Sequence, residues 1–406
     1  MRARWPTLVA VVGLLVFAVL QQAPVPAPVP WTPSSLPRDA VRRGIEARRA
    51  ASVPLGCPEH TLVLCGPWFG RHGNQVWTVG TLMAIARALN RTALLRPFHQ
   101  TLEKQFHTHD PSQSSVRFGH LYDTAAIGKP GAPLADYCVA ETEEMAVDMK
   151  PTHAVDDAFL RAIRFLPPNG GDNMTGFQSP VIALNAQEVF FLHLRLFPDY
   201  DETPGGPEKF FSFSAAISNI TAKTLAALGI DSTKPTVAVH HRWHEGHCRR
   251  WLWSLFQQQH DFDPRICAIQ PDFAMYMLQS QFPRQFPSRN LTAIAAVQFV
   301  LSSDGQHADS LAAWQRFGIK HNNNVFVLTE RTLRALPAQA HLHPLEAIAS
   351  SMEILVNSSY FIPNAVSTMS RVPRSMRLAR RLPTLRPVTQ WEGLKMDFGE
   401  AVSRFL

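Results

Sequence analysis

The chain has 406 residues, which is enough for two domains of ordinary size. An apolar content of 46% and a charged content of 17% exclude a disordered chain. The net charge of +7 suits anionic partners such as nucleotide phosphates or a membrane surface. The Lys and Arg are scattered and no RNA- or DNA-binding motif accompanies them, which argues against nucleic acid.

The first 55 residues predict a targeting segment and a stem. Arg2 and Arg4 precede an apolar run over 8–20, as in a secretory signal. That run is shorter than the roughly 20 residues that span a bilayer, so 1–23 is expected to be a cleaved signal peptide or a type II single-pass anchor. The Pro-rich 24–55 is expected to be an extended spacer or a disordered mature N-terminus. Both alternatives place the rest of the chain in the lumen of the endoplasmic reticulum or Golgi.

Sequons and cysteines fit that compartment. Local disulfides are expected between Cys57 and Cys65 and between Cys248 and Cys267, with Cys138 left over; five ordinary buried thiols are the alternative. Five Asn-x-Ser/Thr sequons begin at Asn90, Asn173, Asn219, Asn290 and Asn357.

The first regular block predicts one βαβ unit. A buried strand is expected over 61–65, and apolar residues then recur at helical spacing over 76–89. A second strand is expected over 92–95. The middle of the chain, about 100–230, has many Pro and Gly and no clear period, so no element is assigned there.

A second alternating block predicts another parallel sheet. Its strands are expected over 236–240, 295–301, 324–328 and 360–362, with helices over 345–356 and from Ser367–Thr368 to about 380. The fold class is therefore α/β, with two Rossmann-like domains over 56–230 and 231–406 that face a central cleft. In such sheets, ligands bind beyond the carboxyl ends of the strands.

Two of the loops could bind an anion. In Gly70–Gln75, the glycines allow close backbone approach and the helix start favours negative charge; a plain strand-to-helix turn is the alternative. His240–Arg242 ends a predicted strand, and alternation places His240 and Arg242 on the same side. A guanidinium there could stabilise a departing diphosphate, although Arg242 could also be an ordinary surface charge.

Two later strand ends add polar groups. Asp304 could accept hydrogen bonds from a guanine edge, and Ser367 and Thr368 could hold a diphosphate with the amides that follow them. A strand-end aspartate and a helix cap are the structural alternatives.

Metal sites are weakly indicated. The helical zinc signature needs two His four apart, whereas His244-Glu245-Gly246-His247 spaces them by three around a Gly. The Asp-x-Asp triplets at 199–201 and 261–263 follow no clean buried strand. No metal is therefore expected.

Five stretches, taken in chain order, resemble the GDP-fucose protein O-fucosyltransferase 1 family. They keep the family's order and spacing over about 60–380, and they are Gly70–Gln75, Ala88–Thr92, Val237–Arg242, Ser303–Asp304 and Asn364–Thr368. The resemblance implies a GT-B fold and metal-free, inverting transfer of fucose from GDP-fucose to a Ser or Thr hydroxyl of a folded EGF-like repeat.

The resemblance also implies roles for single residues. Arg242 and Asn74 match the family's essential arginine and its loop asparagine, the first on the β-phosphate and the second near fucose and acceptor. The other implied substrate-binding residues are Arg71, Gly73, His240, Asp304, Ser367, Thr368 and Met369. The chain departs from the family at Met369, where an aromatic is usual, and over 243–248, where Glu245 stands in for an acidic contact.

Two other functions share these features. A GDP-fucose-dependent enzyme could act on a glycan instead of a protein. A catalytically silent relative could bind glycoproteins as a chaperone or lectin, but the presence of Arg242 and Asn74 argues against silence.

Overall fold

The computed structural model describes residues 61–66, 68, 70–100, 115–127, 137–139, 150–155, 159, 181–190, 207–242, 269–281, 297–305, 307–321, 323–336, 341–364 and 367–385. The chain forms two compact units, Met1–Ala51 and Ser52–Leu406, and every described residue belongs to the second. The predicted signal and stem lie outside the described residues. The predicted domain boundary at 230/231 stays a prediction.

The first sheet has four described strands, all parallel. They run in the order β5 (Tyr137–Val139), β2 (Thr92–Leu95), β1 (Thr61–Cys65), β6 (Val181–Asn185). Counted along the chain this order is 3-2-1-4, that of a nucleotide-binding half. The strands predicted at 61–65 and 92–95 are confirmed, and both are completely buried.

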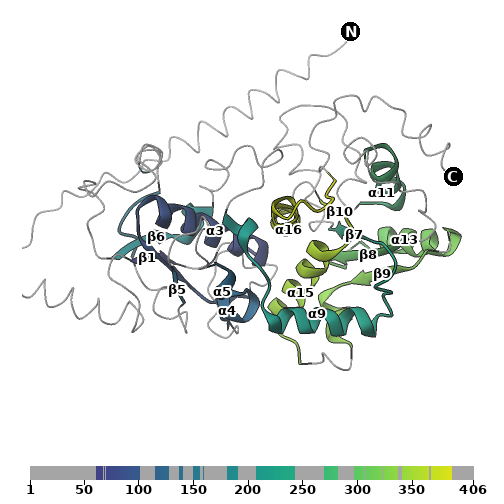
Figure 1. Cartoon of the computed structure of the whole chain (residues 1–406), viewed down its shortest axis with the longest axis horizontal. Helices are drawn as coiled ribbons and strands as arrows, with labels where there is room; N and C mark the ends of the chain where they lie inside the picture. Colours follow the sequence, from purple (N-terminus) through teal and green to yellow (C-terminus); the bar gives the residue numbers. More distant parts are fainter. Residues whose placement is uncertain are drawn as a thin grey trace, which may run out of the picture. The chain divides into compact units, whose positions relative to one another are not determined.

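Helix α3 (His72–Ala88) follows β1 and lies beside it in Figure 1. It begins four residues before the predicted apolar positions. Most of its residues are buried, and they lie on more than one face of the helix; Val79 and Leu82 are completely buried. The reason is that the sheet covers one face and helix α16 (Thr368–Ala379) packs on another. The helix ends before Asn90, whose φ of 50° is left-handed.

The second sheet repeats the order of the first. Its strands run β10 (Tyr360–Ile362), β7 (Thr236–His241), β8 (Gln298–Ser303), β9 (Val325–Leu328), again all parallel and again 3-2-1-4. All four predicted strands are confirmed, but β8 begins at Gln298 and not at 295. The Gln298 side chain exchanges two hydrogen bonds with the backbone of Asp231, which fixes the start of the strand. The fold class, α/β with parallel sheets, is therefore confirmed.

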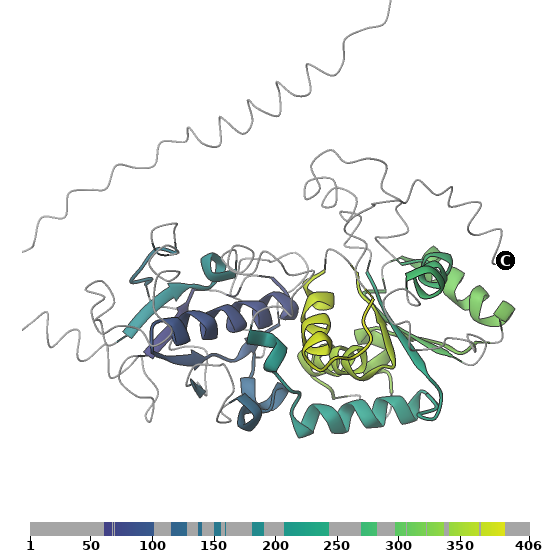
Figure 2. The ribbon, with the colours of Figure 1, turned by 45° about the horizontal axis from the view of Figure 1, so that its top comes forward.

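The middle of the chain, where no element was predicted, contributes short elements and one long helix. The long helix α9 (Ala215–Ala227) is prominent in Figure 2. Besides β5 and β6, the short elements in and next to this segment are β3 (Phe98–His99), β4 (Ser115–Val116), α4 (Phe118–Leu121), α5 (Thr124–Ile127) and the 3₁₀ turn η1 (Pro207–Phe210).

Two late helices share the apolar core that surrounds the first sheet. The second half contains α11 (Pro271–Tyr276), which continues into η4 (Met277–Gln281), and α13 (Ala308–His321), α14 (Glu330–Arg334), α15 (Pro344–Asn357) and α16. Met352 of α15 and Met376 of α16 belong to the same apolar core as Leu62 of β1. The two helices therefore tie the late part of the chain to the early sheet.

The predicted Cys57–Cys65 disulfide was wrong, and so was the expectation that Cys138 is left over. The Cys248–Cys267 disulfide stays a prediction. Cys65 is a free thiol inside β1, and burial raises its pKa to about 11. Cys138, expected to be left over, is disulfide-bonded. The pairing was inferred from closeness in sequence, but Cys65 is the last residue of a fully buried strand and its side chain lies in the interior. Cys57, Cys248 and Cys267 lie outside the described residues.

Two further expectations concern the compartment. The sequon residues Asn90, Asn219 and Asn357 are exposed, and the other two lie outside the described residues. Among the helices that the structure describes, none combines the length and apolar character needed to cross a bilayer. The apolar run over 8–20 lies outside the described residues, so the signal or anchor and the lumenal location both stay predictions.

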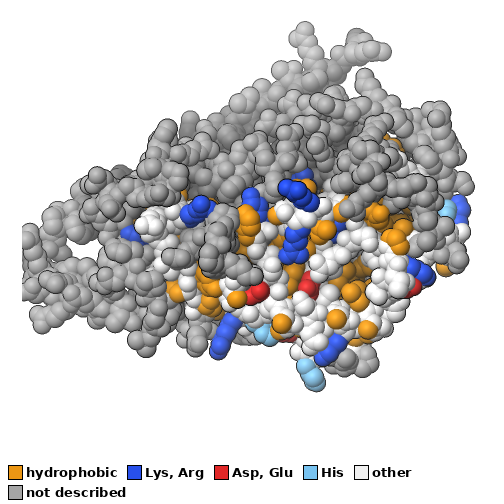
Figure 3. All heavy atoms as spheres, viewed as in Figure 1, with side chains coloured by type: hydrophobic (Ala, Val, Ile, Leu, Met, Phe, Trp, Pro, Cys, Tyr) orange, Lys and Arg blue, Asp and Glu red, His pale blue; other side chains and the backbone are white. Residues whose placement is uncertain are grey.

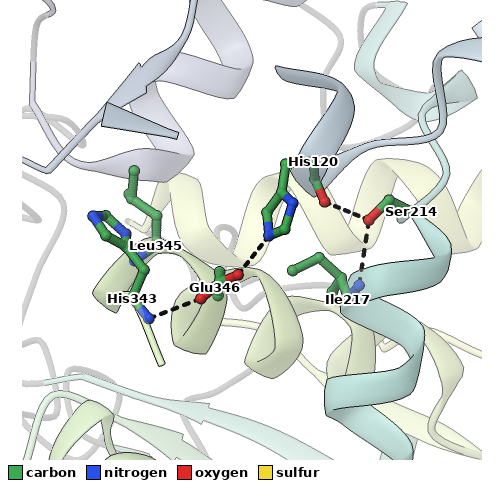
Figure 4. Close-up of polar contacts among 6 residues, drawn as sticks. All are labelled: His120, Ser214, Ile217, His343, Leu345 and Glu346. Carbon is green, nitrogen blue, oxygen red and sulfur yellow. Dashed lines mark hydrogen bonds and ion pairs between the residues drawn. The ribbon is translucent and has the colours of Figure 1, made fainter. Parts of the chain in front are cut away.

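His120 and Glu346 link helix α4 to helix α15 (Figure 4). His120 Nε2 lies 2.5 Å from Glu346 Oε1, while Glu346 Oε2 accepts from the backbone N–H of His343 at 2.8 Å. The second bond belongs to the capping box of α15. The carbonyl of His120 also accepts from Ser214, the N-cap of α9. Three helices thus meet at one polar node.

Two substitutions at Glu346 separate the ion pair from the cap. Glu346→Gln keeps an acceptor for His343 N–H and loses only the charge, so we expect a loss of about 0.5 kcal/mol in unfolding free energy, because the half-exposed His120 is screened by water. Glu346→Ala also loses the cap, at about 1 kcal/mol more. Urea unfolding measures both, and equal losses in the two variants would contradict this division.

Candidate functional site

The predicted site residues cluster at the switch points of the two sheets. In a 3-2-1-4 sheet, connections diverge between strands 1 and 4, which opens a crevice beyond their carboxyl ends. These strands are β1 and β6 in the first sheet and β7 and β10 in the second. Helix α3 follows β1, Arg242 follows β7, and α16 follows β10. Helix α3, Arg242 and helix α16 therefore follow the carboxyl ends of these strands, the edge at which open parallel sheets bind ligands.

The 70–75 loop is shaped by Gly70 and Gln75. Gly70 has φ +68°, and a Cβ there would lie 2.0 Å from Asn74 Nδ2. Gln75 Nε2 donates to the carbonyl of His99 at 2.7 Å, and His99 N–H donates to Gln75 Oε1 at 2.9 Å. The Gln75 side chain therefore pairs with the backbone of β3 as another peptide group would, whereas Asn74 contacts α16.

His72 supports the loop from inside. It is 1% exposed, its Nε2 lies 2.9 Å from the Tyr122 hydroxyl, and its ring packs on Phe98 and Tyr122. Burial lowers the pKa of His72 to about 3, so the ring stays neutral. This histidine is a structural residue of the loop.

Helix α3 and helix α16 meet at their N-termini. A Cβ on Gly73 would lie 2.9 Å from the backbone N of Met369 and 3.0 Å from the carbonyl carbon of Thr368. Only glycine permits this approach. Thr368 Oγ1 donates to Asn74 Oδ1 at 2.6 Å, which locks the two helices together. Four predicted site residues from distant parts of the sequence are thereby in contact.

Both helix ends lack the groups that usually neutralise them. The N-cap of α3 is Arg71, half-buried, and neither it nor Ser367 at the N-cap of α16 caps with its side chain. Neither helix has an acidic residue in its first turn. The other described helices of eight or more residues have a cap or an acid there: Ser214 in α9, Asp309 in α13, and His343 with Glu346 in α15.

Unused donors collect at this junction. Hydrogen bonding begins at the Asn74 amide in α3 and at the Ser370 amide in α16. Within the described part of the chain, the two amides before each of these have no acceptor, as expected for the first turn of a helix. The Ser367 hydroxyl, 1% exposed, also has no hydrogen-bond partner there.

The end of β7 is anchored to α16. His240 Nδ1 lies 2.7 Å from Ser370 Oγ, which also accepts from Asn364 N–H at 2.7 Å. Asn364 Nδ2 in turn donates to the carbonyl of Arg242 at 3.4 Å. His240, predicted as a nucleotide contact, is 3% exposed and ties strand to helix. Sequence reasoning missed Ser370; its only signal is the three-residue spacing from Ser367.

Arg242 lies next to Asp304. Their Nε and Oδ2 atoms are 3.9 Å apart, and the side chains are 14% and 8% exposed. Both residues follow the ends of neighbouring strands, β7 and β8. The distance exceeds that of a hydrogen bond, so the carboxylate holds the guanidinium by charge.

His241 points to the opposite side of β7 from His240. Its ring lies between Ser303 Oγ at 3.0 Å and Ser310 Oγ at 2.7 Å. Burial, aided by the charge of His307, lowers the pKa of His241 to about 4. The strand alternation predicted for this segment therefore holds, and His241 is a neutral structural residue.

A search of the described residues finds no group of three or more His, Cys, Asp or Glu placed to hold a metal. The His244–His247 cluster and both Asp-x-Asp triplets lie outside those residues. On the described surface in Figure 3, Lys and Arg side chains are widely spread and Asp and Glu are few, which suits an anionic ligand.

No protein-family model and no curated protein matches the sequence. Among solved structures, POFUT1 in complex with GDP is similar at a TM-score of 0.48 and 18% identity, over 81% of this chain and 98% of that one. POFUT1 with GDP-fucose gives 0.47 and 18%, over 82% and 98%. The fucosyltransferase NodZ from Bradyrhizobium gives 0.38 and 12%, over 78% and 93%. At these TM-scores the likenesses carry no conclusion about the reaction of this chain.

The buried histidines predict acid sensitivity. Unfolded His has its ordinary pKa near 6.5, whereas folded His241 and His72 stay neutral down to about 4 and about 3. The unfolded state therefore binds more protons below pH ~6.5. As the pH is lowered from there, the free energy of unfolding decreases by up to about 1.4 kcal/mol per pH unit for each histidine. Urea unfolding at several pH values should show this slope, and His241→Gln should reduce it. An unchanged slope in that variant would contradict the assignment.

Gly73→Ala tests the helix junction. Intrinsic helix propensity alone would favour alanine by about 1 kcal/mol. The new Cβ would instead press on the backbone of α16, so we expect a net loss of about 1–3 kcal/mol in thermal or urea unfolding.

Gly119→Ala in α4 is the matched control, because its Cβ would meet only Thr124 Cγ2 at an ordinary 3.4 Å. A stabilised Gly73→Ala variant would show that the two helices do not press on each other.

Proposed function

We propose that this chain is a glycosyltransferase that moves fucose from GDP-fucose, with inversion, to a Ser or Thr hydroxyl of a folded protein acceptor such as an EGF-like repeat. The observation that carries the proposal is the meeting of two unneutralised helix N-termini at Gly73 and Thr368. Asn364, which donates to Ser370 of α16, also donates to the carbonyl of Arg242. The order of the five family-like stretches supports GDP-fucose as the donor.

The helix junction suits a diphosphate. Each helix N-terminus carries the equivalent of roughly half a positive charge, and its first amides point outward. The amides of His72 and Gly73 in α3, and of Thr368 and Met369 in α16, are the available donors. The buried Ser367 hydroxyl adds another. Arg242 supplies a permanent cation with a planar fork for two phosphate oxygens.

The reaction breaks the bond between fucose C1 and the β-phosphate oxygen, and the electron pair leaves with GDP. The acceptor hydroxyl oxygen forms the new bond to C1 from the opposite face, and its proton passes to solvent water. Negative charge on the diphosphate grows as the bond breaks, so donors fixed around it bind the transition state more tightly than the substrate. Arg242 and the helix ends have this role, and Asn74 faces the sugar and acceptor.

Neighbouring residues position this machinery. Asp304 holds Arg242 with one carboxylate oxygen, and we assign the other to the guanine edge. His240 anchors α16 through Ser370, and Arg71 and Met369 flank the two helix ends. Because the helix ends and Arg242 meet the diphosphate charge, the proposal includes no metal. It also includes a GT-B arrangement of the two halves and a lumenal location in the endoplasmic reticulum or Golgi.

The proposal is tested with purified protein and a panel of nucleotide sugars, each with and without a folded EGF-like repeat or a glycan acceptor. We expect GDP release and fucose transfer with GDP-fucose and the EGF-like repeat. Transfer only to the glycan would change the acceptor class. If the protein binds a nucleotide but releases no nucleotide from any of the nucleotide sugars, it is a silent binding protein, and the enzymatic proposal is overturned.

Arg242→Ala is expected to lower kcat/KM for GDP-fucose by roughly 10²–10³, the usual effect of removing one transition-state donor. Arg242→Lys should recover only part of this loss, because an ammonium cannot hold two phosphate oxygens at once. Arg334→Ala is the control, since Arg334 is exposed and paired with Glu330 on α14. Wild-type turnover in Arg242→Ala would exclude the assigned role.

A further inference from the structure

The side chain of Asn74 is held on both sides. Its Oδ1 accepts from Thr368 Oγ1 at 2.6 Å. Its Nδ2 occupies the space over Gly70 that a Cβ would fill, at 2.0 Å from the ideal Cβ position. Its own backbone is fixed as well, because the Asn74 N–H donates to the carbonyl of Arg71 at 2.8 Å and the Asn74 carbonyl accepts from Thr78 Oγ1 at 2.9 Å. The amide therefore sits in one defined orientation.

A hydroxyl has a single proton to donate. The Thr368 hydroxyl gives it to Asn74, so this side chain has no proton left for a phosphate oxygen. The Thr368 backbone amide, in the first turn of α16, remains available. The carbonyl side of the Asn74 amide is occupied by Thr368, which leaves the NH₂ group to interact with a ligand.

We propose that Thr368 is a positioning residue: its hydroxyl fixes the amide of Asn74 so that Asn74 offers N–H donors, not a carbonyl oxygen, to the sugar donor. This inference rests on the proposed function and sharpens it. Thr368 then contacts the diphosphate through its backbone only, which revises the side-chain phosphate role implied by resemblance. Asn74 would donate to an oxygen that becomes more negative during transfer.

The position of the bond explains why a side chain from the other half performs this task. Asn74 lies in the first turn of α3 and Thr368 in the first turn of α16, 294 residues apart. The bond can form only when Gly73 lies against α16. Asn74 is thus held in this orientation only when the first turns of α3 and α16 are in contact, which couples orientation of the donor group to assembly of the anion site.

Three variants test the inference. Thr368→Val keeps the shape and the backbone amide but removes the hydroxyl, and we expect kcat to fall about 10–100-fold while KM for GDP-fucose changes less than about threefold. Thr368→Ser restores the donor and should recover most of kcat. Asn74→Asp keeps the acceptor for Thr368 and replaces the NH₂ group with a negative oxygen, so activity should fall further.

The opposite pattern would overturn the inference. A raised KM at unchanged kcat in Thr368→Val would mean that the hydroxyl binds the diphosphate directly. Near-wild-type activity in Asn74→Asp would mean that Asn74 presents an oxygen to the substrate. Urea midpoints close to wild type establish that the variants are folded.

A measurement without turnover separates this inference from the proposed function. In protein labelled with ¹⁵N-asparagine, the side-chain NH₂ signals of Asn74 are those lost in Asn74→Asp. We expect them to shift in Thr368→Val, to return toward wild type in Thr368→Ser, and to move when GDP is added. If the Asn74 signals do not shift in Thr368→Val, the positioning role is refuted even if fucose transfer is observed. If the signals shift as expected but no fucose is transferred, only the proposed function is refuted.

Discussion

The contact between Gly73 and the backbone of α16 is the constraint on which the site depends. With no side chain at position 73, the first turns of α3 and α16 come close enough for Thr368 to bond Asn74. Helix α3 is then covered by the sheet on one face and by α16 on another, which is why nearly all of it is apolar or small. Arg371 adds to the contact by lying over the ring of Trp77, 5.1 Å from its centroid.

Sheet topology brings the remaining groups to this contact. Because both sheets have the order 3-2-1-4, their first and fourth strands are neighbours and end at the same edge. Arg242 leaves β7 and the segment before α16 leaves β10, and the Asn364 side chain bonds across from one to the other at 3.4 Å. The site is therefore assembled by parallel strand order, with hydrogen bonds that only refine it.

Much of the sheet structure could be predicted because its strands have short apolar runs at their centres, and α3 and α15 because their apolar residues recur at 3.6 spacing. The long helices α9 and α13 were missed. The strand β6 was missed although 181–184 are apolar, since the surrounding segment gave no pattern to frame it. The candidate residues were found through loops at strand ends. Their partners were not, because Ser370 with His240 and Thr368 with Asn74 pair across 130 and 294 residues. Cys65 shows the converse error, in which closeness in sequence suggested a bond that a buried strand prevents.

The strongest reason to regard this junction as a binding site is that two long helices with unneutralised N-termini meet beside a buried, unsatisfied hydroxyl. A good N-cap is worth about 1 kcal/mol, and α9 and α15 have one. Ser367 stands at the N-cap of α16, is a residue type well suited to capping, and yet leaves its buried hydroxyl without a partner in the described structure. A buried unsatisfied hydroxyl costs about 1–3 kcal/mol. Two uncapped helix ends, an unsatisfied serine and adjacent positive dipoles are each unfavourable alone, and one bound anion would satisfy all of them. Several local rules that fail together at a single place are the mark of a functional site.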